Sequence, residues 1–297
     1  MRSKLQKPQL PANFVPRAAL NRKLDQNPVV LVSASAGSGK STAVSAWLDT
    51  QPRYLWYRLD AWDNDIDAFF MHLALGVDAV MGTPPELGLQ QWVGARSTMG
   101  DDTLIRAMVV HLEQLPGPAI WIFDDYHEAA NPIIHQLIGQ ILQHLGPQHK
   151  LCLITREDPP IMLAKVRAAG QLSSIREADL RMTVEEAEVL LDPRLSAEQL
   201  TFVHERTEGW VAGLQLTGQT LLVTDSVTGF IEAYRDSKDY MMDYLVEEVL
   251  ARQPEAIRQF LKRTSIFDDF CPDLVDSTLG LARSEEHTSE LQSRHNL

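Results

Sequence analysis

The chain has 297 residues, of which 44% are hydrophobic and 23% charged, a composition typical of an ordinary globular protein of about two domains. Its formal net charge of -13 argues against a large nucleic-acid-binding face, because such faces need clustered Lys and Arg. Cys152 and Cys271 lie far apart and favour neither a disulfide framework nor a zinc site, and no apolar run is long enough to cross a bilayer. We therefore expect a cytoplasmic protein.

The N-terminal segment, residues 1–25, is basic and is interrupted by Pro8, Pro11 and Pro16. No apolar stretch of the kind found in a signal peptide follows it. We expect a solvated arm that leads into the first strand.

From residue 29 to about residue 176, short apolar runs alternate with amphipathic stretches, which is typical of β-α units around a parallel sheet. The predicted strands cover residues 29–33, 54–59, 119–124, 151–155 and, more weakly, 172–176. The predicted helices between them cover residues 41–48, 66–80, 103–115, 132–145 and 161–169. This pattern predicts an α/β domain over residues 26–180, with helices flanking the sheet.

The stretch VVLVSASAGSGKST, residues 29–42, matches the phosphate-binding pattern G-x-x-x-x-G-K-[ST], except that Ala34 replaces the first glycine. That glycine mainly shapes the exit from the strand, so alanine can replace it if its φ stays negative. The motif follows an apolar strand and opens an amphipathic helix, which is the context that a P-loop requires. The nucleotide-binding residues that it predicts are Ala36, Gly37, Ser38, Gly39, Lys40, Ser41 and Thr42.

The second half of such a site is an acidic residue at the end of another buried strand, and AIWIFDDYHE supplies Asp124 and Asp125. We expect Ser41 and Asp124 to hold Mg²⁺ and Asp125 to polarise the attacking water. Lys40 is expected to bind the phosphates of ATP. A pair of aspartates after a strand can also be a simple turn or helix cap, and this alternative stays open.

Arg156 follows the predicted strand at 151–155, at the edge of the sheet where ligands bind. An arginine there can contact the γ-phosphate of ATP. The alternative is a surface arginine that forms a salt bridge with Glu157 or Asp158.

After residue 180 the pattern changes to helices without strands, which predicts a separate helical region over residues 181–282. Thr183 with Glu186, and Ser196 with Gln199, form capping boxes that open two helices. Further helices are predicted at 210–222, 238–252 and 254–263. The final stretch, residues 283–297, contains RSEEHTSELQS, which one reading frame of a common sequencing adapter encodes, so we expect a non-native read-through tail.

The ordered set of these motifs resembles the N-terminal part of MalT-like, LuxR-type ATP-dependent transcriptional activators, which are signal-transduction ATPases with numerous domains. The resemblance runs from about residue 14 to residue 280. It depends on the segments VPRAAL, SAGSGKST, LWYRLDAWDNDIDAF, IFDDYHEAANPIIH, LITREDPP, TEGWVAGLQL and YLVEEVLARQPEAIRQFLKRTSIFD. Arg58 departs from it, because the family usually has a small polar residue at that position.

The resemblance implies an ATPase domain and a helical and partly winged-helix region, followed in the family by a sensor domain and a DNA-binding helix-turn-helix. It implies that ATP favours a self-associating form and that slow hydrolysis resets it. Arg156 and Arg17 match family arginines near the nucleotide. DNA would be bound only through domains absent from this fragment. Two alternatives stay open, a stand-alone P-loop enzyme and a scaffold that binds ATP without hydrolysing it.

Overall fold

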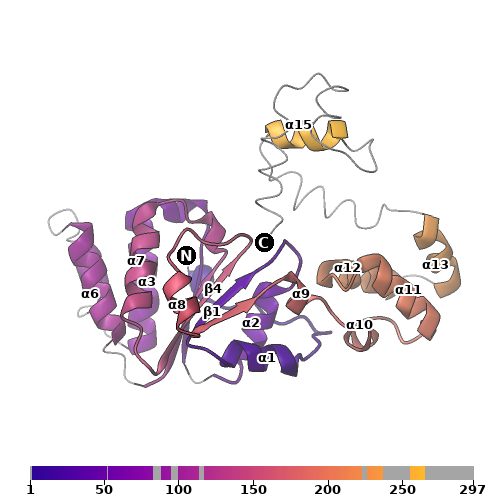
Figure 1. Ribbon diagram of the computed structural model, residues 1–297, viewed down its shortest axis with the longest axis horizontal. Coiled ribbons are helices and arrows are strands. Elements are labelled where there is room, and N and C mark those ends of the chain that lie inside the picture. Colours follow the sequence, from indigo (N-terminus) through magenta and orange to yellow (C-terminus); the bar gives the residue numbers. More distant parts are fainter. Residues whose placement is uncertain are drawn as a thin grey trace. The chain divides into compact units, whose positions relative to one another are not determined.

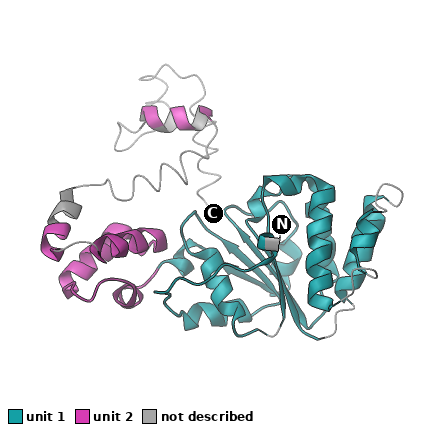
Figure 2. Ribbon diagram, turned by 180° about the vertical axis from the view of Figure 1, so that it is seen from behind, with its two compact units in different colours: residues 1–181 teal, residues 182–297 magenta. Residues whose placement is uncertain are grey.

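The structure is a computed structural model, and it describes residues 2–51, 53–82, 88–94, 100–113, 117–222, 226–236 and 255–264. The chain divides into two compact units, residues 1–181 and residues 182–297, and each is described here by itself (Figure 2). In the described ranges, no helix has the length and apolar character that crossing a membrane requires. The predicted helix at 238–252 and the predicted tail at 283–297 lie outside the described residues.

Unit 1 is built around a five-stranded parallel sheet (Figure 1). Its strands are β1 (Val29–Ser33), β2 (Tyr54–Arg58), β3 (Ala119–Asp124), β4 (His149–Thr155) and β5 (Leu172–Ile175). The spatial order is β2-β3-β4-β1-β5. Both β1 and β3 are buried along their whole length, because helices cover both faces of the sheet. All five predicted strands are confirmed, with ends shifted by at most two residues.

Helices pack on both faces of this sheet and enclose two hydrophobic cores. The α-helices of unit 1 are α1 (Ala18–Asp25), α2 (Lys40–Leu48), α3 (Ile66–Met81), α4 (Gln90–Gly94), α6 (Asp101–Glu113), α7 (Pro132–Gln143), α8 (Ala164–Ala168) and α9 (Glu177–Leu180). One core lies against α3, α6 and α7, and the other lies against α1 and α2. Alternate strand residues enter the two cores: Leu31 joins the first, and Val30 and Val32 join the second. The predicted α/β fold with flanking helices is confirmed.

The N-terminal segment packs on unit 1, so the expectation of a solvated arm was wrong. A short 3-10 helix, η1 (Arg2–Leu5), brings Lys4 to the buried carboxylate of Asp63, with an Nζ to Oδ2 distance of 2.8 Å. Lys7 forms a 3.0 Å hydrogen bond to the carbonyl of Ser45 and an ion pair with Asp49. Local charge and proline content could not reveal these contacts, because each joins residues that are distant in sequence.

Unit 2 is helical in its described part. Its helices are α10 (Val184–Leu190), α11 (Ala197–Thr207), α12 (Val211–Leu222), α13 (Val227–Asp236) and α15 (Glu255–Thr264). Both predicted capping boxes are confirmed, at the starts of α10 and α11. After α11 the chain turns through Gly209, which has a φ of 72° and accepts a 2.8 Å hydrogen bond from the amide of Met182. This turn therefore ties the end of α11 to the start of the unit.

Candidate functional site

The strand order brings the predicted site residues to one edge of the sheet. Because the strands are parallel, their carboxyl ends lie along the same edge, where ligands bind in such folds. β4 lies between β1 and β3, and Ser33 at the end of β1 pairs with Thr155 at the end of β4. The phosphate-loop motif therefore follows β1, Arg156 follows β4 and Asp124 is the last residue of β3, at the ends of three adjacent strands.

The loop between β1 and α2 has the backbone that a phosphate-binding loop needs. Gly37 and Gly39 have φ values of 73° and 81°, in the left-handed region that favours glycine. Ala34 does not have a positive φ, and it packs into the core beside α2. Alanine therefore fits where the motif has its first glycine. The amides of the first turn of α2 stay unpaired within the helix, which suits an anion.

Lys40 is the first residue of α2, and its side chain folds back over the loop. Its Nζ donates to the carbonyls of Ala34 and Ser35 at 2.8 and 2.6 Å. An ammonium group has three N–H donors, so one is left for a phosphate oxygen. Burial, followed by repulsion from Arg156, lowers the pKa of Lys40 to about 8. The charges of Asp125, Glu177 and Asp124 offset this lowering only in part, and a bound triphosphate would add further negative charge beside the buried cation.

Ser41 and Asp124, which were predicted as magnesium ligands from two separate motifs, are joined by a hydrogen bond. Ser41 Oγ donates to Asp124 Oδ1 at 2.8 Å, although the residues are 83 positions apart. Asp124 is only 3% exposed, and burial, together with the nearby charge of Asp125, raises its pKa to about 6. A hydroxyl and a carboxylate at this separation are close enough to contribute oxygens to one Mg²⁺.

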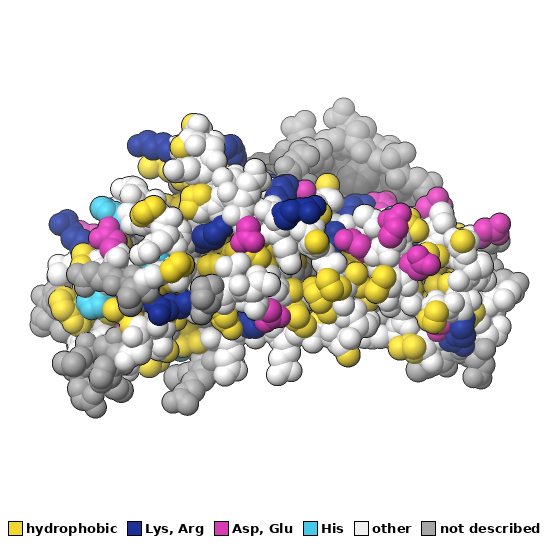
Figure 3. All heavy atoms as spheres, turned by 90° about the horizontal axis from the view of Figure 1, so that it is seen from below, with side chains coloured by type: hydrophobic (Ala, Val, Ile, Leu, Met, Phe, Trp, Pro, Cys, Tyr) yellow, Lys and Arg dark blue, Asp and Glu magenta, His cyan; other side chains and the backbone are white. Residues whose placement is uncertain are grey.

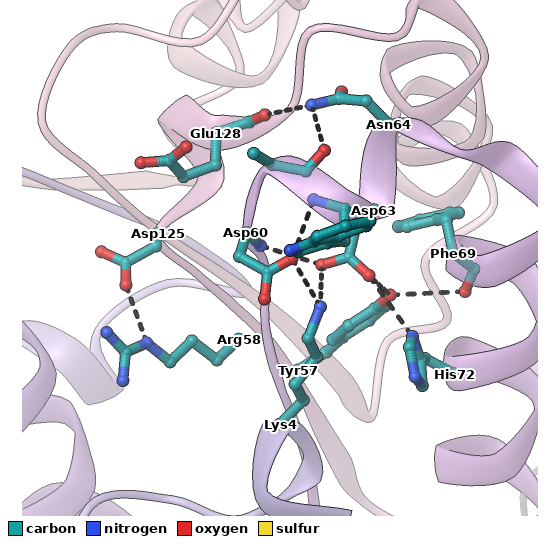
Figure 4. Close-up of polar contacts among 12 residues, drawn as sticks. Lys4, Tyr57, Arg58, Asp60, Asp63, Asn64, Phe69, His72, Asp125 and Glu128 are labelled. Carbon is teal, nitrogen blue, oxygen red and sulfur yellow. Dashed lines mark hydrogen bonds and ion pairs between the residues drawn. The ribbon is translucent and has the colours of Figure 1, made fainter. Parts of the chain in front are cut away.

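Asp125 lies directly after β3 and has an unusual backbone. Its φ is 53°, which is uncommon for a residue with a side chain, and its amide donates to Asp124 Oδ1 at 3.0 Å. Its carboxylate is bonded to the arginine at the end of β2: Arg58 Nε donates to Asp125 Oδ2 at 2.9 Å (Figure 4). Arg58 was noted in the sequence only as a departure from the related family, and its partner could not be predicted.

Arg156 directly follows β4, at the edge of the sheet where the phosphate loop also lies, and its positive charge is one cause of the lowered pKa of Lys40. The carboxylate of Asp158, one of the two predicted alternative partners, binds the guanidinium of Arg176 through bonds of 2.5 and 2.9 Å. The predicted contact of Arg156 with the γ-phosphate stays a prediction.

Arg17 lies at the segment through which the chain leaves unit 1. Its guanidinium donates to the carbonyls of Asp179, Leu180 and Arg181 at 3.2, 2.7 and 2.8 Å. Its predicted contact with the nucleotide stays a prediction.

Glu177 is a residue of the loop's surroundings that the motifs did not indicate. One carboxylate oxygen, Oε2, accepts both the amide and the hydroxyl of Ser35 at 2.9 Å. Glu177 opens α9, which follows β5, and β5 pairs with β1. Only the strand order places it beside the loop, so no local signal in the sequence could have found it.

The remaining predicted loop residues lie where the motif places them. Ser38 is buried and donates from Oγ to the carbonyl of Ser35 at 2.8 Å. Ala36 lies in the turn that precedes Gly37, and Thr42 lies in the first turn of α2. Among the described residues, no group of three or more His, Cys, Asp or Glu side chains is arranged to hold a metal ion. A magnesium site here would consist of Ser41, Asp124 and phosphate oxygens.

Comparison with known proteins supports the resemblance read from the motifs. Residues 246–297 match the family described as the MalT winged helix domain. The HTH-type transcriptional regulator MalT of Cronobacter sakazakii is 27% identical over 305 aligned residues, which cover 98% of this chain and 33% of the relative. MalT of Yersinia enterocolitica gives the same values. The chain thus spans about a third of the length of these relatives, and the resemblance to MalT-like regulators is confirmed.

Two solved structures show a weak structural similarity to this chain. One is a signal transduction ATPase with numerous domains and a tetratricopeptide repeat sensor from Pyrococcus horikoshii, with a TM-score of 0.48, 14% identity, and coverage of 98% of this chain and 40% of that one. The other is AMPPCP-bound DnaA from Aquifex aeolicus, with a TM-score of 0.42, 13% identity, and coverage of 95% and 89%. The fold assignment depends on the strand order and the loop, not on these scores.

Proposed function

We propose that this chain carries the ATP-binding switch of a MalT-like transcription regulator, with slow hydrolysis that resets the switch. The observation that carries the proposal is the 2.8 Å contact between Ser41 at the start of α2 and the buried Asp124 at the end of β3. It joins the loop that would bind phosphates to the acid that would bind a metal. A turn or helix cap needs no such partner, so this contact favours the functional interpretation of Asp124.

In this proposal the residues 36–42 bind the phosphates, and Ser41 and Asp124 hold Mg²⁺, which would neutralise charge on the phosphates. Lys40 supplies a cation from within the loop. Asp125 accepts a hydrogen bond from the attacking water, and Arg156 contacts the γ-phosphate. Together these residues account for binding, charge neutralisation and water activation.

The wider regulatory role is also part of the proposal. ATP would favour a self-associating form, and DNA would be contacted by domains other than the two units described. On the face drawn in Figure 3, both basic and acidic side chains of the described residues are exposed. A cytoplasmic location is consistent with this role.

Thermal unfolding with Mg-ATP tests the proposal. A ligand at one hundred times its dissociation constant adds about 2.7 kcal/mol of stability, which is several degrees of melting temperature for a domain of this size. We expect this shift in the parent and in Lys165→Ala, an exposed lysine on α8 that serves as the control. Lys40→Ala should lose the shift, and Asp125→Asn should keep it while losing ATP turnover.

Three results would count against this function. An equal shift in Lys40→Ala and in the parent would show that ATP does not bind at the loop. Equal turnover in Asp125→Asn and in the parent would remove Asp125 from the mechanism. A parent that binds Mg-ATP and never hydrolyses it would favour the scaffold alternative.

A further inference from the structure

The acid that the proposed function uses to polarise water is already bonded to an arginine. β2 and β3 are paired so that Arg58 lies opposite Asp124, and Asp125 is the next residue after Asp124. Arg58 Nε donates to Asp125 Oδ2 at 2.9 Å, and Figure 4 shows the two side chains pointing toward each other. The register of the sheet therefore sets this pair, because both residues lie at the ends of neighbouring strands.

The position of Asp125 is restrained from two sides. Its backbone has a φ of 53°, and its amide is bonded to the buried carboxylate of Asp124. Its own carboxylate is bonded to Arg58, and a hydrogen bond between two charged groups is stronger than one between neutral groups. The direction of the carboxylate is thus determined by Asp124 on one side and Arg58 on the other.

We propose that Arg58 is a positioning residue that restrains Asp125 and thereby keeps ATP hydrolysis slow, an inference that depends on the proposed function. An oxygen that accepts the guanidinium N–H is less available to accept a hydrogen bond from water. Oδ1 is not part of this bond, so Asp125 can accept a hydrogen bond from water through Oδ1 only in the direction that the ion pair sets, or through Oδ2 once the pair opens. Arg58 is 66% exposed, so packing does not lock the pair and the restraint is moderate.

Steady-state ATP turnover of four variants tests this role. In Arg58→Ala we expect kcat to rise about two- to fivefold, the range that corresponds to one partly exposed ion pair. Arg58→Lys should rise less, because an ammonium group can still pair with the carboxylate. Arg53→Ala removes an arginine beside the opposite end of β2 and should match the parent. The double variant Arg58→Ala with Asp125→Asn should have the same kcat as Asp125→Asn alone, because the restrained base is gone.

The melting shift with Mg-ATP separates this inference from the proposed function. An unchanged shift in Arg58→Ala shows that nucleotide binding persists, so a change in kcat reports on hydrolysis alone. A kcat that falls or stays constant in Arg58→Ala would overturn the restraint, as would undetectable turnover in both this variant and the parent. A rise that persists in the double variant would show that Arg58 acts through another group. Absence of any shift in the parent would instead refute the proposed function.

Discussion

The buried carboxylate of Asp63 allows a quantitative prediction about the N-terminal segment. Asp63 is 1% exposed and accepts hydrogen bonds from Lys4, from the hydroxyl of Tyr57 and from the amide of Asp60, each at 2.8 Å, and lies 3.3 Å from Nδ1 of His72 (Figure 4). Burial raises the pKa of Tyr57, so its hydroxyl keeps its proton and stays a donor. Lys4 supplies a positive charge to this network. Its substitution by Met removes that charge and keeps a side chain of similar size.

The magnitude follows from how deeply the pair is buried. Removing one partner of a fully buried ion pair costs about 3–5 kcal/mol, and an exposed pair contributes about 0–1 kcal/mol. Lys4 is 17% exposed, and Asp63 keeps its other hydrogen-bond partners in the variant. We therefore expect Lys4→Met to lower the free energy of unfolding by about 2 kcal/mol, between these two limits.

Urea unfolding of Lys4→Met beside Lys7→Met measures this difference. Lys7 comes from the same segment, pairs with Asp49, whose side chain is 55% exposed, and donates to the carbonyl of Ser45, so its substitution should cost about 1 kcal/mol. Equal losses in the two variants, or no loss in Lys4→Met, would refute the argument that burial of Asp63 makes its cation important.

Two further predictions concern regions away from the site. His149 is buried, its Nδ1 has no partner among the described residues, and burial lowers its pKa from 6.5. The imidazole therefore binds a proton more readily in the unfolded chain than in the folded one, so the free energy of unfolding should fall as the pH drops below 6.5. In His149→Gln this fall should be smaller, which urea titrations at a series of pH values would measure. Gly209→Ala should cost about 2–3 kcal/mol, because φ is positive and an added Cβ would lie 2.4 Å from the carbonyl oxygen of Met182. Gly170→Ala, with positive φ and open space, should cost only about 1 kcal/mol in the same unfolding assay, and equal costs would contradict the steric argument.

Local sequence was enough to predict the strands, the phosphate loop and the acid of β3. Each of these depends on signals within a few residues: an apolar run, two glycines before Lys40, or an aspartate at the end of a strand. The contact between Ser41 and Asp124 follows once both motifs are assigned to the same edge of a parallel sheet.

Partners set by strand order and register could not be predicted in this way. Arg58 finds Asp125 because β2 pairs with β3, and Glu177 reaches Ser35 because β5 pairs with β1. No periodicity in the chain specifies which strands are neighbours. The docking of Lys4 was missed for a related reason, since a basic residue near a terminus usually lies in solvent.

The six-residue stretch 176–181 has an implication for shortened versions of this protein. It is anchored by the guanidinium of Arg17 and by the ammonium group of Lys23, which binds Asp179 at 2.8 Å, and both anchors precede the first strand. A chain trimmed to begin at residue 26 would keep every residue of the phosphate loop. It would nevertheless lose both anchors, whereas the start of the stretch would stay held, where Arg176 binds Asp158 and Glu177 binds Ser35.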